Sequence, residues 1–491
     1  MLSLSILIPL FGALALAAMP AMPEATARRI AIGVAAIPLV LLLIVWAGFR
    51  PGAGFQWVEE MPWMPGLGIA WRLGVDGLSL SLTLMSALLF LAAIAWPMAP
   101  LPRARSYYAW FLFLMSVSLG LFLALDLVIF YVFFDLGLVG MYFLIGRWGH
   151  GEAERAALKF FIYTLAGSLL ILIGIIVLAL SMPVLSFDMR AVIAAAPLDG
   201  TGLTAVLVLL AFVIGFGIKT PLFPFHTWLP PAHVNAPGPV SAILAGVLLK
   251  MGTYGLIRLA MQMMPATFAD WAMPIAVVAV ISILWGAIVA LGQSDLKRRI
   301  AYTSVNHMGY TVLGIAVAGS ALGSEAARAM ALTGAVVEMI AHGLITGALF
   351  LIAGAFWQRA EEYEMDSYGG LARLAPRLTG ATVLASFASL GLPGLAGFVA
   401  ELHIFLGAFA VYPWLGAVGL IGLLITAALF LDILRRVFFG DLPKARESFT
   451  DLTQTEIGIL SGLLALVVLI GVWPGWLLGL IGAASLLPVA G

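Results

Sequence analysis

Apolar runs of about 20 residues recur along the whole chain, and each is long enough to cross a hydrocarbon layer of roughly 30 Å as a helix. Only 10% of the 491 residues are charged, against roughly 25% in soluble domains. Backbone groups in lipid must bond within their own segment, and the alternating sequence pattern of a membrane β-barrel is absent. The chain is therefore predicted to be an all-α polytopic membrane protein.

Charged, proline-rich or glycine-rich breaks divide these runs into fourteen predicted transmembrane helices. They lie at residues 2–19, 30–48, 75–96, 107–124, 126–146, 158–181, 203–222, 239–262, 270–291, 300–318, 327–356, 379–411, 414–436 and 455–482. The first run lacks a basic leader and a distinct cleavage site, so it is expected to be retained as a helix. The segment 379–411 contains Gly391-Leu392-Pro393-Gly394 and can form two half helices. Residues 1–491 are predicted to form a single membrane domain.

The basic residues divide unevenly between the loops on the two sides of the membrane. Seventeen of the 24 fall in alternate loops: Arg28, Arg29, Arg103, Arg105, Arg147, Arg155, Lys159, Lys297, Arg298, Arg299, Arg359, Arg373, Arg377, Arg435, Arg436, Lys444 and Arg446. The opposite loops hold Arg50, Arg72, Arg190, Arg258 and Arg328. Because cytoplasmic loops carry the excess of Lys and Arg, the 146–158, 357–378 and 437–454 loops are predicted to be cytoplasmic. Both termini are then predicted on the periplasmic side of a bacterial inner membrane.

Cysteine is absent from the sequence. This excludes thiolate ligation of iron–sulfur clusters, thioether attachment of haem and disulfides. Any electron transfer linked to this protein is therefore expected on another chain.

Seven of the ionisable residues inside the predicted helices are the strongest site candidates, because a charge at the bilayer centre costs about 2.5–3.5 kcal/mol on insertion scales. They are Asp135, Lys219, Lys250, His307, Glu338, His342 and Glu401. Their distribution over several helices is typical of a lateral proton or ion relay. Structural ion pairs are the alternative, but two lysines with acids and histidines on neighbouring helices favour a route for protons or ions.

Two of these residues lie beside breaks in their helices. Lys219 is followed by Pro221 and Pro224, and Glu401 follows the Pro393-Gly394 break. Interrupted helices in corresponding halves of a membrane protein, each beside a charge, indicate inverted repeats with a site near the midplane. An ordinary proline kink explains either break alone but not the matched pair.

Glu338 and His342 are four residues apart and share one helix face. His342 can carry protons near neutral pH, although a hydrogen-bonded core histidine is the alternative. His226, His233 and His403 are weaker candidates. Metal-ligand spacing is not found among the histidines, so no metal is predicted. Asp126 and Asp432 are predicted to be structural.

Four ordered motifs resemble those of the antiporter-like subunits of respiratory complex I. They are Pro221–Pro230 (PLFPFHTWLP), Leu244–Gly252 (LAGVLLKMG), Asp295–Tyr302 (DLKRRIAY), and Gly391–Phe398 (GLPGLAGF) followed by Glu401. The resemblance covers essentially the whole chain and is strongest to the M type, the counterpart of mitochondrial subunit 4. Glu401 supports the M type, because the sister L and N types are expected to carry lysine there.

The resemblance implies two inverted repeats of five helices, at residues 107–262 and 270–436. It also implies a role in coupling quinone reduction to proton pumping, with L-type and N-type subunits as neighbours. NADH, FMN, iron–sulfur clusters and quinone are expected on partner subunits, and no cofactor is expected on this chain. By position, Lys219 and Lys250 match the lysines of the first half, His307 and His342 the histidines of the second half, and Glu401 the acid of the second broken helix.

Three positions depart from the family pattern. The acid of the fifth helix is usually glutamate and here is Asp135, so its contact with Lys219 can require a water. The family's Leu-Pro-Asp-Ala-His reads Leu-Pro-Pro-Ala-His at 229–233, and Glu338 stands where glutamine is expected. These departures leave open a related assembly, such as a ferredoxin-linked or hydrogenase-linked complex.

The sequence therefore predicts a proton-translocating subunit of NADH:quinone oxidoreductase that does no redox chemistry itself. Two alternatives remain. One is a subunit of a multisubunit cation/proton antiporter, against which Glu401 argues. The other is a membrane scaffold whose charges only pair helices, against which the two lysines without neighbouring acids in sequence argue.

Overall fold

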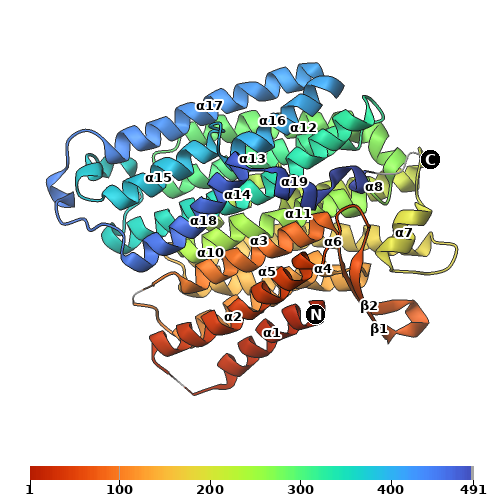
Figure 1. Ribbon diagram of the computed structural model, residues 1–491, viewed down its shortest axis with the longest axis horizontal. Helices are drawn as coiled ribbons and strands as arrows, with labels where there is room; N and C mark the ends of the chain where they lie inside the picture. Colours follow the sequence, from red (N-terminus) through yellow and green to blue (C-terminus); the bar gives the residue numbers. More distant parts are fainter. Residues whose placement is uncertain (21, 99, 488–491) are drawn as a thin grey trace.

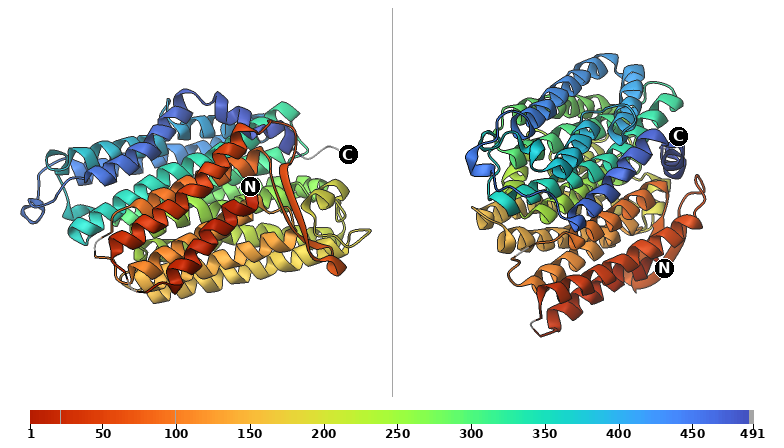
Figure 2. Two further views of the ribbon diagram at one scale, coloured as in Figure 1. Left: turned by 60° about the horizontal axis from the view of Figure 1, so that its bottom comes forward. Right: turned by 60° about the vertical axis from the view of Figure 1, so that its left-hand side comes forward.

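Long helices run side by side through most of the computed structural model, which describes residues 1–20, 22–98 and 100–487 (Figure 1). Within these residues, ten helices are long and apolar enough to cross a membrane, and three further apolar helices are shorter. The helices α1 and α2 lie on one side of the bundle, and α17 lies on the opposite side (Figure 2). The prediction of a polytopic, helical membrane protein is confirmed.

The first half of the bundle follows the predicted apolar runs closely. Its helices are α1 (Leu2–Ala18), α2 (Glu24–Ala47), α3 (Gly77–Ala95), α4 (Ala104–Leu123), α5 (Leu127–Trp148), α6 (Ala153–Leu180), the short α7 (Met189–Ala195) and α8 (Leu203–Lys219). Asp76 caps α3 and Asp126 caps α5, each by accepting backbone N–H groups of the first turn. Asp126 also pairs with Arg72, so its predicted structural role is confirmed.

The helix predicted at 203–222 ends at Lys219, where the Pro221 and Pro224 break begins. The chain resumes as η2 (Phe225–Trp228) and α9 (Leu229–Asn235). The next crossing is α10 (Gly238–Ile243), η3 (Leu244–Leu248), α11 (Leu249–Gly255) and η4 (Leu256–Met261), in which η3 and η4 are π-helical turns. Such turns are rare and cluster at functional sites.

The second half contains the helices that carry the predicted histidines and carboxylates. They are α12 (Pro265–Leu291), α13 (Leu296–Ala318), α14 (Glu325–Ala360), α15 (Pro376–Ser389), α16 (Ala396–Val411), α17 (Pro413–Phe438), α18 (Gln454–Val472) and α19 (Gly475–Ile481). Three-residue and four-residue turns lie between or after them: η5 (Met365–Ser367), η6 (Leu371–Arg373), η7 (Lys444–Arg446) and η8 (Ala483–Leu486). The 379–411 segment forms two half helices, as its Gly391–Gly394 break allows.

A β-hairpin that the sequence analysis did not predict follows α2. Strands β1 (Gln56–Met64) and β2 (Ile69–Val75) pair antiparallel around η1 (Pro65–Leu67). The N-terminal amine contacts the Glu59 carboxylate of this hairpin. The hairpin therefore marks the end of the bundle at which the chain begins, called the hairpin end below.

Hydrogen bonds gather the three predicted cytoplasmic loops at the opposite end of the bundle, called the far end. His150 N donates to the Asn235 carbonyl, Leu296 N to the Tyr363 carbonyl, and Arg359 Nε to the Thr450 carbonyl. The C-terminal segment lies at the hairpin end, because Gln262 donates to the Leu486 carbonyl there. Among the described residues, the first and the last therefore lie at the same end of the bundle.

Three basic residues assigned to loops are buried instead. Asp295 caps α13, so that helix begins four residues before its predicted start and takes Lys297 and Arg299 into the bundle. Arg299 bonds to Asp432 at 2.8 Å, which confirms the predicted structural role of Asp432. Arg258 lies inside η4. The assignment of Lys297, Arg299 and Arg258 to loops is wrong, because partners distant in sequence stabilise these cations inside the bundle.

Candidate functional site

Lys250 lies in the middle of the central crossing and is fully buried. In an α-helix the Leu249 N–H would bond to the Ala245 carbonyl, but in the π turn it bonds to Leu244 instead. The Ala245 carbonyl then accepts a hydrogen bond from Lys250 Nζ at 2.7 Å. The π turn thus gives the ammonium one of its ligands.

His342 of α14 is the second ligand of Lys250. Lys250 Nζ lies 2.6 Å from His342 Nδ1. His342 Nε2 lies 3.1 Å from Ser304 Oγ of α13, and when Lys250 is protonated its ammonium can only donate, so that Nδ1 accepts and Nε2 carries the ring hydrogen. The imidazole therefore connects the central lysine to α13.

His307 and Glu338 form the next contact. His307 Nδ1 lies 3.0 Å from Glu338 Oε1, and Ser389 Oγ of α15 lies 3.0 Å from His307 Nε2. The His307 and His342 ring centroids are 5.5 Å apart. The predicted shared face of Glu338 and His342 thus serves two different partners, a histidine and a lysine.

Glu401 is buried in the first turns of α16, directly after the second break. Its Oε2 packs against Gly391, where an added Cβ would lie 2.0 Å from that oxygen, and Gly391 has φ +76°. Its Oε1 is buried without a hydrogen-bond partner among the described residues. One turn before Glu338, α14 packs closely against α16, since a Cβ at Gly334 would lie 2.8 Å from the Ala400 carbonyl. The second group of residues therefore runs from Lys250 through His342, His307 and Glu338 to Glu401.

Lys219 and Asp135 form a looser pair in the first half. In the described residues, Lys219 Nζ is buried without a hydrogen-bond partner, and Asp135 forms no ion pair within 4.0 Å. Lys219 Nζ instead lies 5.4 Å from the Phe134 ring and 5.5 Å from the Phe160 ring. The shorter acid therefore does not reach the ammonium directly.

Gly252 lies where the helix that carries Lys250 meets the end of α8 that carries Lys219. A Cβ at Gly252 would lie 2.8 Å from the Phe216 carbonyl and 2.9 Å from the Thr220 amide. The helix of Lys250 therefore packs directly against the broken end of α8 that carries Lys219. Thr220 Oγ1 is buried there without a partner among the described residues.

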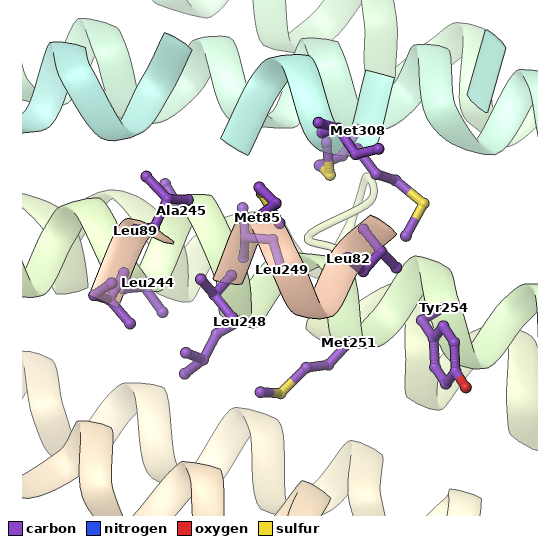
Figure 3. Packing of buried hydrophobic residues seen from close by; sticks show 14 of the residues in the cluster. Leu82, Met85, Leu89, Leu244, Ala245, Leu248, Leu249, Met251, Tyr254 and Met308 are labelled. Atoms are coloured by element: carbon purple, nitrogen blue, oxygen red, sulfur yellow. The ribbon is translucent and has the colours of Figure 1, made fainter. Parts of the chain in front are cut away.

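Apolar side chains surround the central lysine. Leu82, Met85 and Leu89 of α3 lie against the central crossing, whose own apolar residues Leu244, Leu248, Leu249 and Met251 are buried with them (Figure 3). A buried charge in such surroundings exchanges protons only with the few polar groups that touch it.

The weaker histidine candidates differ in their contacts. His226 accepts from Trp285 Nε1 at 3.1 Å, and His403 Nδ1 bonds to the Val399 carbonyl of its own helix at 2.7 Å. His233 stacks on Phe350, and neither of its ring nitrogens has a partner among the described residues. Ser304 and Ser389 were missed, because a buried serine has no distinguishing signal in one sequence. A cluster of three or more His, Cys, Asp or Glu that could hold a metal is not found in the part of the chain that the structure describes.

Buried ionisable side chains on several neighbouring helices of a many-helix membrane protein are typical of the class of ion-translocating or proton-translocating proteins. Comparison with known proteins narrows this class. The family described as NADH:quinone oxidoreductase/Mrp antiporter, TM, matches residues 124–426. The chain belongs to this family.

Named relatives and a solved structure match nearly the whole chain. The NADH-quinone oxidoreductase subunit M of Rhodobacter capsulatus is 37% identical, over 94% of this chain and 90% of that protein. The NAD(P)H-quinone oxidoreductase chain 4 2 of Thermosynechococcus vestitus is 38% identical, over 95% and 88%. A chain in the structure of respiratory complex I from Thermus thermophilus with bound NADH superposes with a TM-score of 0.88 and 31% identity, covering all of both chains.

Proposed function

We propose that this chain is a proton-translocating membrane-arm subunit of an NADH:quinone oxidoreductase of the complex I type, in a bacterial inner membrane. The observation that carries the proposal is the set of contacts from Lys250 through His342 and His307 to Glu338, with Glu401 buried on the adjacent helix α16. Each of these groups can bind and release a proton. Membership in a family whose named relatives are quinone oxidoreductase subunits supports the coupling to quinone reduction.

Each residue has a distinct part in this proposal. Asp135 sets the charge state of Lys219, and Lys219 and Lys250 pass protons along the midplane. Glu401 exchanges them with the periplasmic side. The sequence has no cysteine to ligate an iron–sulfur cluster, which supports assigning NADH, FMN, iron–sulfur clusters and quinone to partner subunits. Neighbouring L-type and N-type subunits would drive transfer by changing the pairing of the buried groups.

We further propose fourteen membrane crossings arranged as two inverted repeats, at residues 107–262 and 270–436. The break after Lys219 in the first repeat and the break before Glu401 in the second support this division, because each places a charged residue beside an interrupted helix.

Purification of the intact complex through a tag on this chain tests the assignment. We expect quinone oxidoreductase subunits to co-purify, and quinone reduction to acidify reconstituted vesicles without added sodium. A complex that exchanges sodium for protons and lacks redox subunits would instead support the antiporter alternative, which shares the family.

The uneven distribution of basic residues predicts that the far end faces the cytoplasm. Single cysteines in the 146–158, 357–378 and 437–454 loops should react with impermeant reagents in inside-out vesicles only. The cysteine-free chain provides an unlabelled background. Reaction from the periplasmic side would reverse the proposed orientation.

Proton pumping should depend on the negative charge of Asp135 and not on the length of its side chain. Asp135→Glu should retain pumping, because it keeps the carboxylate and Asp135 makes no direct contact with Lys219. Asp135→Ala should lower the pumping rate about tenfold, since roughly 1.4 kcal/mol of lost stabilisation of the charged lysine has that effect. The measurement is initial vesicle acidification per quinone reduced. Full pumping by an assembled alanine variant would reject this role.

A further inference from the structure

A polar cavity of about 510 Å³ lies at the hairpin end of the first half, beside the central crossing. Asp76, Asp199, Arg258 and Gln262 line it, together with Ser485 of the C-terminal segment. The cavity is large enough and polar enough to hold several water molecules. Water can therefore bring protons from that face of the membrane to Arg258.

Arg258 lies between this cavity and Lys250. Lys250, Tyr254, Arg258 and Gln262 follow one another at intervals of four residues, so they form a stripe along one crossing. At about 1.5 Å of rise per residue, Arg258 is roughly 12 Å from Lys250 along the helix. Arg258 therefore lies on the direct line along this crossing from the cavity to the central lysine.

The Arg258 guanidinium is held on several sides. It is 1% exposed, and it bonds to Asp76 through Nη2 and to Gln262 Oε1 through Nη1 at 3.0 Å. It also lies 5.2 Å from the Tyr254 ring and 5.1 Å from the Phe55 ring. Gln262 in turn donates to the Leu486 carbonyl at 2.8 Å.

The ionisable groups that line the cavity are held by fixed hydrogen bonds, and the cation among them is an arginine. A guanidinium does not deprotonate in proteins. Asp76 accepts from Ser79 N at 3.0 Å and Ser79 Oγ at 3.1 Å as well as from Arg258. Asp199 accepts from the backbone N–H groups of Ala266 at 2.7 Å and Thr267 at 3.0 Å. Fixed donors therefore already engage one carboxylate oxygen, Oδ1, of each acid.

We propose that the Arg258–Asp76 ion pair is an electrostatic plug that prevents protons in the hairpin-end cavity from reaching Lys250. This inference rests on the proposed proton-translocating function. A fixed positive charge at a constriction excludes protons and other cations. The plug directs protons that Lys250 releases toward His342 and His307. It also prevents protons in the hairpin-end cavity from returning to Lys250.

The test is passive proton leak through the reconstituted parent complex, without turnover. The Asp76→Asn/Arg258→Gln double variant removes both charges and leaves no unpaired buried carboxylate. We expect its proton leak under an imposed potential to rise about tenfold, the factor that about 1.4 kcal/mol of barrier represents. Adding Lys250→Met should return the leak to the wild-type rate.

A matched control removes another buried ion pair, at the far end. Arg359 Nη2 and Glu456 Oε2 are 2.6 Å apart, and Arg359→Gln/Glu456→Gln should leave the leak unchanged. If the double variant does not assemble, Arg258→Lys keeps the pair but places a group that can release its proton, and the leak should again rise.

A leak equal to the wild-type rate in either assembled variant would overturn the plug. A leak that persists after Lys250→Met would also overturn it, because the protons would then bypass the central lysine. Failure of the proposed function would look different: the wild-type complex would reduce quinone without acidifying the vesicles.

Discussion

Replacing Lys250 with arginine should abolish proton pumping by the assembled complex. The guanidinium keeps the positive charge but does not release its proton at accessible pH. The larger head group must also fit where Nζ lies 2.7 Å from the Ala245 carbonyl and 2.6 Å from His342 Nδ1. We expect vesicle acidification to fall about tenfold or more, since even 1.4 kcal/mol of added barrier has that effect.

Lys250→Met separates the carrier role from a structural one. Methionine fills similar space and removes a buried charge whose desolvation is costly, so the complex should assemble while pumping and coupled quinone reduction fall. The control variant Lys444→Arg makes the same lysine-to-arginine change at an exposed loop residue. It should leave pumping and coupled quinone reduction unchanged. Wild-type pumping by the Lys250→Arg complex would show that only a fixed charge is needed there.

The sequence predicted the members of the site better than their contacts. Charges inside apolar runs identified Lys250, His342 and Glu401, because such charges are costly in a bilayer. The spacing of Glu338 and His342 predicted a shared face on α14, which is confirmed. Periodicity could not predict that His342 contacts Lys250, since that contact depends on how α14 packs against another helix 92 residues away.

The pattern of apolar residues could not predict where the backbone departs from regular α-helix. The π turns η3 and η4 lie inside an uninterrupted apolar run, so the sequence around Lys250 looks like an ordinary helix. The β1–β2 hairpin lies between two apolar runs and was left without a predicted structure. Its Pro62 and Pro65 hide the alternating pattern by which strands are found.

Buried arginine and lysine residues were wrongly assigned to loops, and the reason is physical. A cluster such as Lys297, Arg298 and Arg299 is typical of a loop, but a capping aspartate at 295 extends the helix through it. Partners such as Asp432 for Arg299 and Asp76 for Arg258 come from distant segments. One sequence without homologues gives no signal for such pairs.

Glu401→Gln should be nearly as severe as the change at Lys250. Glutamine keeps the shape of the side chain and its packing against Gly391, but it cannot bind and release a proton. Because Glu401 is 3% exposed and lies next to the second helix break, we propose it as the group that exchanges protons with the periplasmic side. Pumping should fall about tenfold or more, which corresponds to roughly 1.4 kcal/mol, with assembly intact.

His403→Gln on the same helix is the matched control. His403 bonds to the carbonyl of Val399, in its own helix, and is only half-buried, so its replacement should leave pumping within about twofold of wild type, less than 0.5 kcal/mol. Glu401→Asp retains an exchangeable proton and should recover part of the loss, because Gly391 leaves room for the carboxylate to move. If the glutamine variant pumps as well as wild type, the carboxylate is structural and protons leave by another group.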